Sequence, residues 1–154
     1  MSLISFKDIN HLLTKYRKEN FKLVFTNGCF DLLHKGHIDL LLNAAAFGDK
    51  LFVGLNSDKS VKKLKGDSRP IQNERNRAQK LLELKYVNHV IIFEDLTPKK
   101  LIHIISPDVL VKGGDYKTNE IVGAKHVISS GGVVKIIPLT PGFSTTSIIE
   151  KSSN

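Results

Sequence analysis

Two histidines stand three residues apart directly after the first strongly apolar run of the chain. His34 and His37 follow a β-favouring segment at residues 22–26 and precede a helical pattern of leucines and alanines. Residues three apart share one face of a helix, so both rings are predicted to point the same way. A strand that runs into a glycine-marked turn and then a helix is a common way for an α/β protein to present phosphate-binding groups. Residues 26–37 are therefore predicted to form the reaction centre.

The chemistry that suits these histidines is the stabilisation of phosphate charge. At a helix N-terminus the dipole and the free backbone N–H groups favour an anion. Imidazole N–H groups there can donate to phosphate oxygens and to charge that develops in a transition state. Gly28 and Gly36 lack side chains, so a flat base or a phosphate can approach the backbone.

The residues alone leave other interpretations open. The histidine pair is also compatible with an ordinary helix surface, or with metal chelation, although the His-Glu-x-x-His spacing and a third zinc-type ligand are missing. Cys29 could act as a nucleophile, but the Gly-x-Ser/Cys-x-Gly pattern of a nucleophile elbow is absent. A small buried position suits this cysteine better.

The elements that must position these residues follow an α/β pattern. Strands alternate with helices, and most strands are continuous apolar runs. This pattern predicts a Rossmann-like, doubly wound, five-stranded, mainly parallel sheet with helices on both faces. The predicted strands cover residues 22–26, 50–55, 87–93, 108–111 and 133–137. The predicted helices cover residues 5–19 (capped by Ser5), 35–47, 59–64, 120–129 and 144–151, and two more begin near residues 73 and 98.

In such a sheet the ligand crevice lies outside the carboxyl ends of the strands. The turns after the first, second and fourth predicted strands are rich in glycine and polar residues: Asn27-Gly28, residues 56–58 and residues 112–115. The candidate residues are therefore predicted to gather on one edge of the sheet.

Composition narrows the class of protein. The 154 residues are 41% hydrophobic and 25% charged, which is ordinary for a globular domain. No apolar run approaches the roughly 20 residues of a membrane helix, no signal peptide is recognised, and a single cysteine fits a reducing cytoplasm. The net charge of +8 favours anionic partners. Nucleic acid is not expected, because aromatic residues do not interleave with the basic clusters and no zinc-finger or helix-turn-helix pattern is present.

At this point two segments resemble a known family. Residues 26–37, with His34-Lys35-Gly36-His37, are similar to the His-x-Gly-His signature of the nucleotidyltransferase superfamily. Phe143-Ser144-Thr145-Thr146 resembles the Ser-Thr-Thr helix start near the C-terminus of the same superfamily. The resemblance implies one nucleotidyltransferase domain over residues 1–154, with an N-terminal helix at about 5–19 and a catalytic core at about 21–151.

Three further stretches narrow the resemblance. Residues 56–58, residues 64–70 (Leu-Lys-Gly-Asp-Ser-Arg-Pro) and residues 110–116 (Leu-Val-Lys-Gly-Gly-Asp-Tyr) are similar to the adenylyltransferase half of bacterial heptose kinase/adenylyltransferases. The resemblance implies transfer of AMP from ATP to heptose 1-phosphate, giving ADP-heptose and pyrophosphate for lipopolysaccharide or another surface glycan. The alternative is a CTP-dependent cytidylyltransferase acting on glycerol 3-phosphate or a similar alcohol phosphate.

The resemblance also implies roles for individual residues. The catalytic residues would be His34 and His37 at the α-phosphate and Lys65 between the acceptor phosphate and the triphosphate. The nucleotide-binding residues would be Thr26, Asn27, Gly28, Phe30, Gly36, Lys112, Gly113, Gly114, Asp115, Ser144, Thr145 and Thr146. The acceptor-binding residues would be Asp31, Asn56, Lys65 and Arg77.

The implied partners are ATP and a sugar 1-phosphate, in a cytoplasmic homodimer without membrane insertion. Mg²⁺ would accompany ATP and be held mainly by phosphate oxygens and water, with no protein metal ligand. Asp31 could instead be a structural or metal-orienting carboxylate, and Arg77 a surface helix residue. In the family, the last helix often carries a basic residue a turn or two after its hydroxyl residues, and the candidate for that position in this sequence is Lys151. A nucleotide-binding regulatory module without turnover is a competing interpretation, which the intact motifs speak against.

Overall fold

The computed structural model describes residues 1–138; the predicted closing helix at 144–151, with Ser144, Thr145, Thr146 and Lys151, lies outside these residues. The described part contains six strands: β1 (Ser2–Leu3), β2 (Leu23–Gly28), β3 (Lys50–Asn56), β4 (His89–Phe93), β5 (Val109–Gly113) and β6 (Val133–Ile137). All of their pairings are parallel, and the order across the sheet is β1-β4-β3-β2-β5-β6. The Rossmann-like, parallel α/β architecture predicted from the sequence is therefore confirmed.

The number of strands was wrong, since the sequence predicted five. The additional strand, β1, pairs with the outer edge of β4 through Ser2 N–H to the Asn88 carbonyl at 2.9 Å and Ile4 N–H to the Val90 carbonyl at 2.8 Å. A strand of two residues is too short to show an alternating or continuous apolar pattern, so periodicity could not reveal it.

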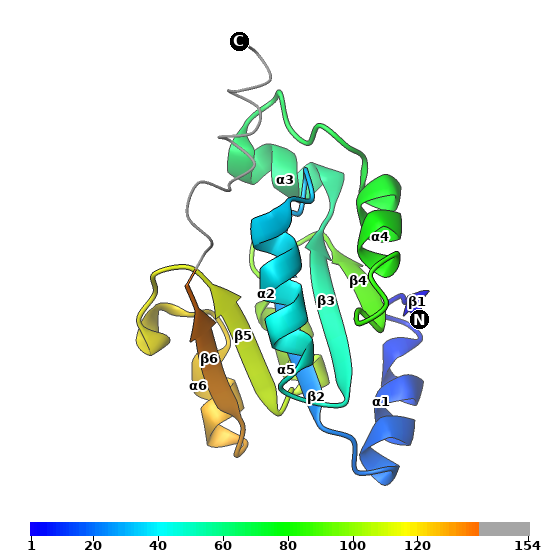
Figure 1. Cartoon of the computed structure of the whole chain (residues 1–154), viewed down its shortest axis with the longest axis vertical. Helices are drawn as coiled ribbons and strands as arrows, with labels where there is room; N and C mark the ends of the chain where they lie inside the picture. Colours follow the sequence, from blue (N-terminus) through cyan, green and yellow to red (C-terminus); the bar gives the residue numbers. More distant parts are fainter. Residues whose placement is uncertain (139–154) are drawn as a thin grey trace.

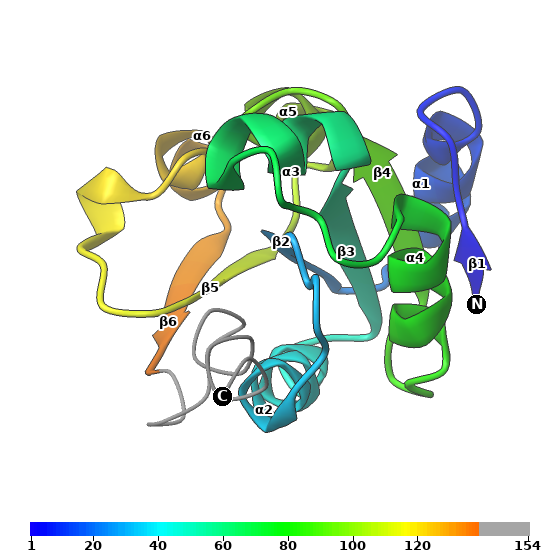
Figure 2. The same ribbon diagram turned by 90° about the horizontal axis from the view of Figure 1, so that it is seen from above.

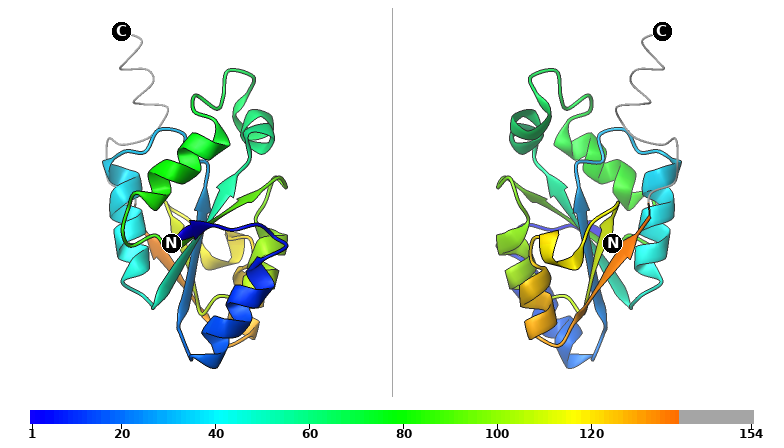
Figure 3. Two further views of the ribbon diagram at one scale, coloured as in Figure 1. Left: turned by 90° about the vertical axis from the view of Figure 1, so that its right-hand side faces the viewer. Right: turned by 90° about the vertical axis from the view of Figure 1, so that its left-hand side faces the viewer.

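Helices cover both faces of the sheet. They are α1 (Ile9–Lys18), α2 (Lys35–Ala45), α3 (Asp58–Lys65), α4 (Glu74–Leu82), α5 (Lys99–Ile105) and α6 (Ala124–Ser129), with a 3₁₀ turn, η1 (Thr118–Glu120). Figure 2 shows α2 and α4 on one face and α1, α5 and α6 on the other. Figure 3 shows the same layers from the sides, and Figure 1 places α3 at the carboxyl end of the sheet.

Each face of the sheet has its own apolar core. On one face, Leu41 of α2 and Leu81 of α4 are fully buried against Val24 and Val53 of the sheet. On the other, helices α1, α5 and α6 pack on Phe25 and on neighbouring aromatic and aliphatic residues. Because both faces are buried, the middle of each central strand is a continuous apolar run, as the sequence pattern indicated.

The chain reverses its direction of growth between β2 and β5. From β2 it adds β3 and β4 on one side, then crosses through α5 to place β5 on the other side of β2. In an open parallel sheet this reversal opens a crevice at the carboxyl ends of the two strands. The crevice here is flanked by Asn27 and Gly28 from β2 and by Lys112 from β5.

Helix α1 begins later than predicted. Its cap is Asp8 rather than Ser5, whose carbonyl and hydroxyl accept from the Asp8 N–H in a turn that precedes the helix. The segment 120–129, predicted as one helix, divides into η1 and α6 because Gly123 has a φ of 86° between them. By contrast, α2 begins at Lys35 and β6 spans Val133–Ile137 as predicted.

A buried histidine ties the edge of the sheet to α1 and gives the fold a pH dependence. The ring of His89 lies 2.7 Å from Tyr16 Oη and 3.1 Å from Ser2 Oγ. Burial, with smaller contributions from the N-terminal ammonium group and Lys50, lowers the pKa of His89 to about 4. Between this pKa and the unfolded value of about 6.5, the unfolded chain binds more protons, so stability falls as the pH falls through that window.

We expect the free energy of unfolding to drop by on the order of 2–3 kcal/mol between pH 7 and pH 4 from His89 alone. Urea denaturation followed by circular dichroism at both pH values measures this loss. In His89→Gln, which cannot titrate, the dependence on pH should be shallower. An equal dependence in wild type and His89→Gln would contradict the assignment.

Candidate active site

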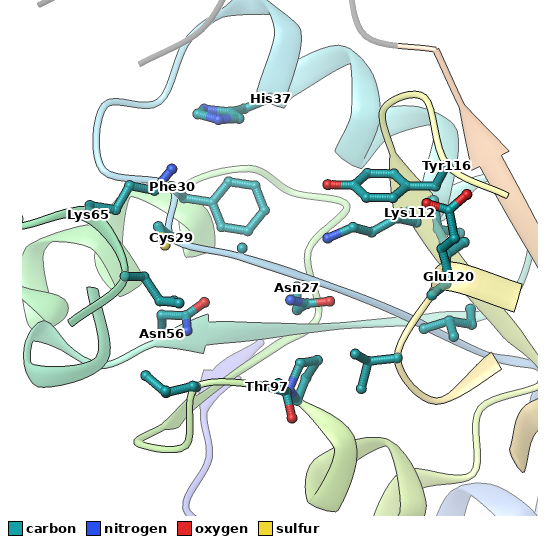
Figure 4. A pocket seen from close by; sticks show the side chains of 18 of the residues that line it. Asn27, Cys29, Phe30, His37, Asn56, Lys65, Thr97, Lys112, Tyr116 and Glu120 are labelled. Atoms are coloured by element: carbon teal, nitrogen blue, oxygen red, sulfur yellow. The ribbon is translucent and has the colours of Figure 1, made fainter. Parts of the chain in front are cut away.

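The carboxyl edge of the sheet holds a cavity of about 540 Å³ at the β2–β5 crevice (Figure 4). Its residues come from the ends of β2, β3 and β5, from the segments that follow β2, β4 and β5, from the start of α2 and from the end of α3. They are Asn27, Gly28, Cys29, Phe30, His37, Asn56, Leu64, Lys65, Arg69, Leu96, Thr97, Pro98, Leu110, Val111, Lys112, Tyr116, Glu120, Ile121 and Val122. Predicted site residues from four separate segments of the sequence therefore line one cavity.

The two histidines cap the N-terminus of α2 for one another. His34 Nδ1 accepts from the backbone N–H groups of Gly36 (3.1 Å) and His37 (3.4 Å), and His37 Nδ1 accepts from the His34 N–H (3.4 Å). The rings stack with centroids 3.7 Å apart. Because both Nδ1 atoms accept, the proton of each neutral ring belongs on Nε2. The N–H groups of Gly36 and His37 are thus engaged here, contrary to the free helix terminus that the sequence suggested.

Both histidines are neutral at pH 7. Burial lowers the pKa of His34. Burial, the adjacent His34 ring and Lys65 lower the pKa of His37 to about 4, against the opposing influence of the Leu32 carbonyl. A neutral imidazole with its proton on Nε2 can donate a hydrogen bond from that N–H without any change in its protonation state. His37 lines the cavity, with its ring over the centre in Figure 4, and can donate to a phosphate oxygen there.

Two lysines approach the cavity from opposite sides. Lys65 is the last residue of α3. The helix is followed by Gly66, which has a φ of 103° and a ψ of 172°, a backbone conformation that residues other than glycine rarely adopt. Lys112 extends from β5, and burial lowers its pKa. Figure 4 shows both ammonium groups pointing towards the region below His37. The hydrogen-bond donors His37, Lys65 and Lys112 thus line one cavity, whose volume of about 540 Å³ leaves room for phosphate groups.

A buried carboxylate holds the loop that follows Lys65. Asp31, 1% exposed, accepts from Arg69 Nε at 2.7 Å and from the backbone N–H groups of Ile71 (2.8 Å) and Gln72 (3.0 Å). Burial raises the pKa of Asp31, but these donors outweigh it and hold the pKa below its usual value. All these bonds go to protein groups, so Asp31 holds the segment from Arg69 to Gln72 in place, and it is absent from the cavity lining.

The position of Arg77 differs more strongly from the sequence prediction than that of Asp31 does. It was predicted to face the acceptor, or to be a surface residue, yet its side chain is completely buried. It donates to the carbonyls of Gln72 (2.9 Å), Cys29 (2.8 Å) and Asn56 (2.8 Å), and pairs with Asp58 at 2.8 Å. Its guanidinium therefore joins the ends of β2 and β3 to α3, and it is absent from the cavity lining.

Cys29 lines the cavity without the properties of a nucleophile. Burial raises the pKa of its thiol despite the nearby charges of Lys65, Arg77 and Arg69. A protonated thiol is a weak nucleophile, which agrees with the small, apolar role expected from the sequence.

With this geometry established, the sequence of residues 25–151 matches the family described as Cytidylyltransferase-like. The chain belongs to the cytidylyltransferase-like family. A "Bifunctional protein HldE" of Koribacter versatilis is 51% identical over 149 residues, which cover 97% of this chain and 31% of that protein. A protein of the same name from Rhodopseudomonas palustris is 54% identical over 140 residues, covering 91% of this chain and 29% of that protein. The chain thus spans about a third of the length of these relatives.

A solved structure supports the same placement. The lipopolysaccharide core biosynthesis protein from Thermoplasma volcanium superposes with a TM-score of 0.63 at 27% identity, covering 78% of this chain and 97% of that one. The nucleotidyltransferase class predicted from the two motifs is confirmed at the level of this family. Among residues 1–138, none of the helices is sufficiently long and apolar to cross a bilayer.

The cytidylyltransferase-like domain does not bring every predicted residue to the cavity. Asn27, Gly28, Phe30, His37, Asn56, Lys65 and Lys112 line it, whereas Thr26, Asp31, His34, Gly36, Arg77, Gly113, Gly114 and Asp115 do not. Gly36 lines a smaller hollow of about 290 Å³ between α2 and the end of β6.

The site residues predicted from the sequence do not include two groups that line the cavity. Leu96, Thr97 and Pro98 follow β4, and Tyr116 and Glu120 follow β5. The signal for the first group was available, because the turn after a third parallel strand must reach the same edge as the others. It was overlooked because this turn carries no glycine and no motif.

Proposed function

We propose that this domain transfers AMP from ATP to a heptose 1-phosphate and releases pyrophosphate. The observation that carries the proposal is the convergence of neutral His37 with Lys65 and Lys112 on one cavity at the crevice of the sheet. The sequence adds specificity, since relatives about 50% identical are named bifunctional HldE proteins and a structural relative is named for lipopolysaccharide core biosynthesis.

The reaction requires positioning and charge neutralisation more than acid–base chemistry. An oxygen of the acceptor phosphate attacks the α-phosphorus of ATP, a new P–O bond forms, and the bond from the α-phosphorus to the bridging oxygen breaks. Pyrophosphate leaves with that electron pair, so no proton has to move. Nε2–H of His37 would donate to the α-phosphate oxygens as their charge increases, and Lys65 and Lys112 would hold the reacting phosphates together.

Mg²⁺ fits this site as a companion of ATP rather than as a protein-bound ion. Among residues 1–138 there is no group of three potential carboxylate, histidine or cysteine ligands. Glu120 is the one acidic residue of the described cavity lining. Bound to the phosphates, the ion would neutralise the charge of the leaving pyrophosphate. The homodimer and the roles of residues 144–146 stay predictions.

The proposal is tested by pyrophosphate release from ATP, CTP, GTP and UTP, each paired with D-glycero-β-D-manno-heptose 1-phosphate and with glycerol 3-phosphate. We expect turnover with ATP and the heptose phosphate, and its loss when EDTA removes Mg²⁺. Turnover restricted to CTP and glycerol 3-phosphate would overturn the proposal in favour of the cytidylyltransferase alternative. Nucleotide binding without turnover on any acceptor would favour a regulatory module.

A further inference from the structure

Tyr116 projects into the cavity from a fixed position. Its ring lies 5.2 Å from Lys112 Nζ on one side. It also packs so closely on Gly114 that a Cβ there would lie 2.8 Å from Tyr116 Cε2, and Gly114 has a φ of 127°. In Figure 4 the phenol oxygen points towards the centre of the cavity. The structure shows no hydrogen-bond partner for this oxygen among residues 1–138, so it is available to a ligand.

Glu120 lies on the same wall, one turn further along the chain. It ends η1, where the backbone N–H of Lys117 donates to its Oε1 at 3.2 Å and restrains the carboxylate. A carboxylate repels phosphate oxygens, and the rest of the described lining supplies the cations Lys65, Arg69 and Lys112. A group opposite Glu120 must therefore donate hydrogen bonds or carry a positive charge, and in a sugar phosphate only the hydroxyl groups meet this requirement.

A sugar fits these requirements better than a nucleotide base does. Each hydroxyl both donates and accepts, so it can pair with the Glu120 carboxylate, the Tyr116 phenol and the Lys112 ammonium.

We propose that Tyr116 and Glu120 are specificity-determining residues that bind the hydroxyl groups of the acceptor sugar, while its phosphate lies between Lys112 and Lys65. This inference rests on the proposed function and adds the part of the cavity that distinguishes a sugar phosphate from simple phosphate. The ring of Tyr116 covers the sugar, and the free oxygen of Glu120 accepts from a hydroxyl.

The test measures KM for heptose 1-phosphate, KM for ATP and kcat in Tyr116→Phe and Glu120→Gln. We expect the acceptor KM to rise about 5-fold in Tyr116→Phe and about 10- to 100-fold in Glu120→Gln, following the strengths of neutral and charged hydrogen bonds. KM for ATP should change less than 2-fold. Matched controls outside the cavity are Tyr86→Phe and the exposed Glu83→Gln, which should leave all three parameters unchanged.

Inorganic phosphate supplies a readout that a merely structural role would not produce. As an inhibitor competing with the acceptor, it has no sugar hydroxyls, so its inhibition constant should be the same in wild type and both variants. Equal weakening of phosphate and heptose phosphate, an increased KM for ATP, or unchanged acceptor KM values would each overturn the inference. Failure of the wild type with ATP and heptose phosphate would refute the proposed function instead. The same comparison would then be made with the acceptor and nucleotide that the wild type does use.

Discussion

Replacing His37 with alanine is expected to lower kcat by about 10²–10³-fold while the domain stays folded. The imidazole is neutral, lines the cavity and carries its proton on Nε2, so it is a donor for charge that grows on the α-phosphate. Its loss removes a donor that matters most in the transition state, and KM for ATP should change much less than kcat.

Pyrophosphate release under saturating substrates measures this effect. His11→Ala, an exposed position on α1, is the matched control and should retain wild-type turnover. Circular dichroism must accompany both, because His37 also accepts the His34 N–H, and loss of a helix cap costs about 1 kcal/mol. A folded His37→Ala enzyme with full turnover would exclude His37 from the mechanism.

Replacing Arg77 with methionine is expected to reduce the free energy of unfolding by about 3–5 kcal/mol. Methionine keeps much of the side-chain volume but removes every donor. The buried carbonyls of Cys29 and Asn56 then lose the Arg77 hydrogen bonds, and Asp58 loses its ion pair. Arg77→Lys should recover only part of the loss, because an ammonium group cannot reproduce the planar fork of donors.

Urea denaturation of Arg77→Met, Arg77→Lys and an Arg75→Ala control measures these differences. Arg75 is exposed on the same helix, so its replacement should change stability by less than about 0.5 kcal/mol. An Arg77→Met protein with unchanged stability and a raised acceptor KM would restore the acceptor-binding role suggested by the sequence.

The sequence was sufficient for the elements that bury both faces of the sheet. The strands around Phe25 and Phe52 are continuous apolar runs bounded by polar turns, and their alternation with helical segments indicates a parallel sheet covered on both faces. The same reasoning placed Asn27, Asn56 and Lys112 at one edge, because strands that run in parallel must end together.

The remaining features depend on contacts that sequence patterns do not contain. Arg77 looks like any arginine of a polar helix; its burial follows from carbonyl groups 48 and 21 residues away that need donors. The mutual capping of His34 and His37 depends on ring orientation, which spacing alone does not fix. The position of the Tyr116 ring depends on its close packing against Gly114. The presence of a glycine allows this contact, but the sequence pattern does not show that it forms.

The bonds of Asp31 and Arg77 also have a consequence for the thermodynamics of substrate binding. Together they attach the segment from Arg69 to Gln72 to the ends of β2 and β3 before any ligand arrives. The conformational entropy of ordering that segment is therefore lost during folding instead of during binding. Arg69, which lines the cavity, is likewise oriented in advance by Asp31, so under the proposed function little reorganisation of this side chain would oppose the approach of the acceptor. An interior carboxylate and an interior guanidinium, both remote from the chemistry, thus determine how rigid the catalytic surface is.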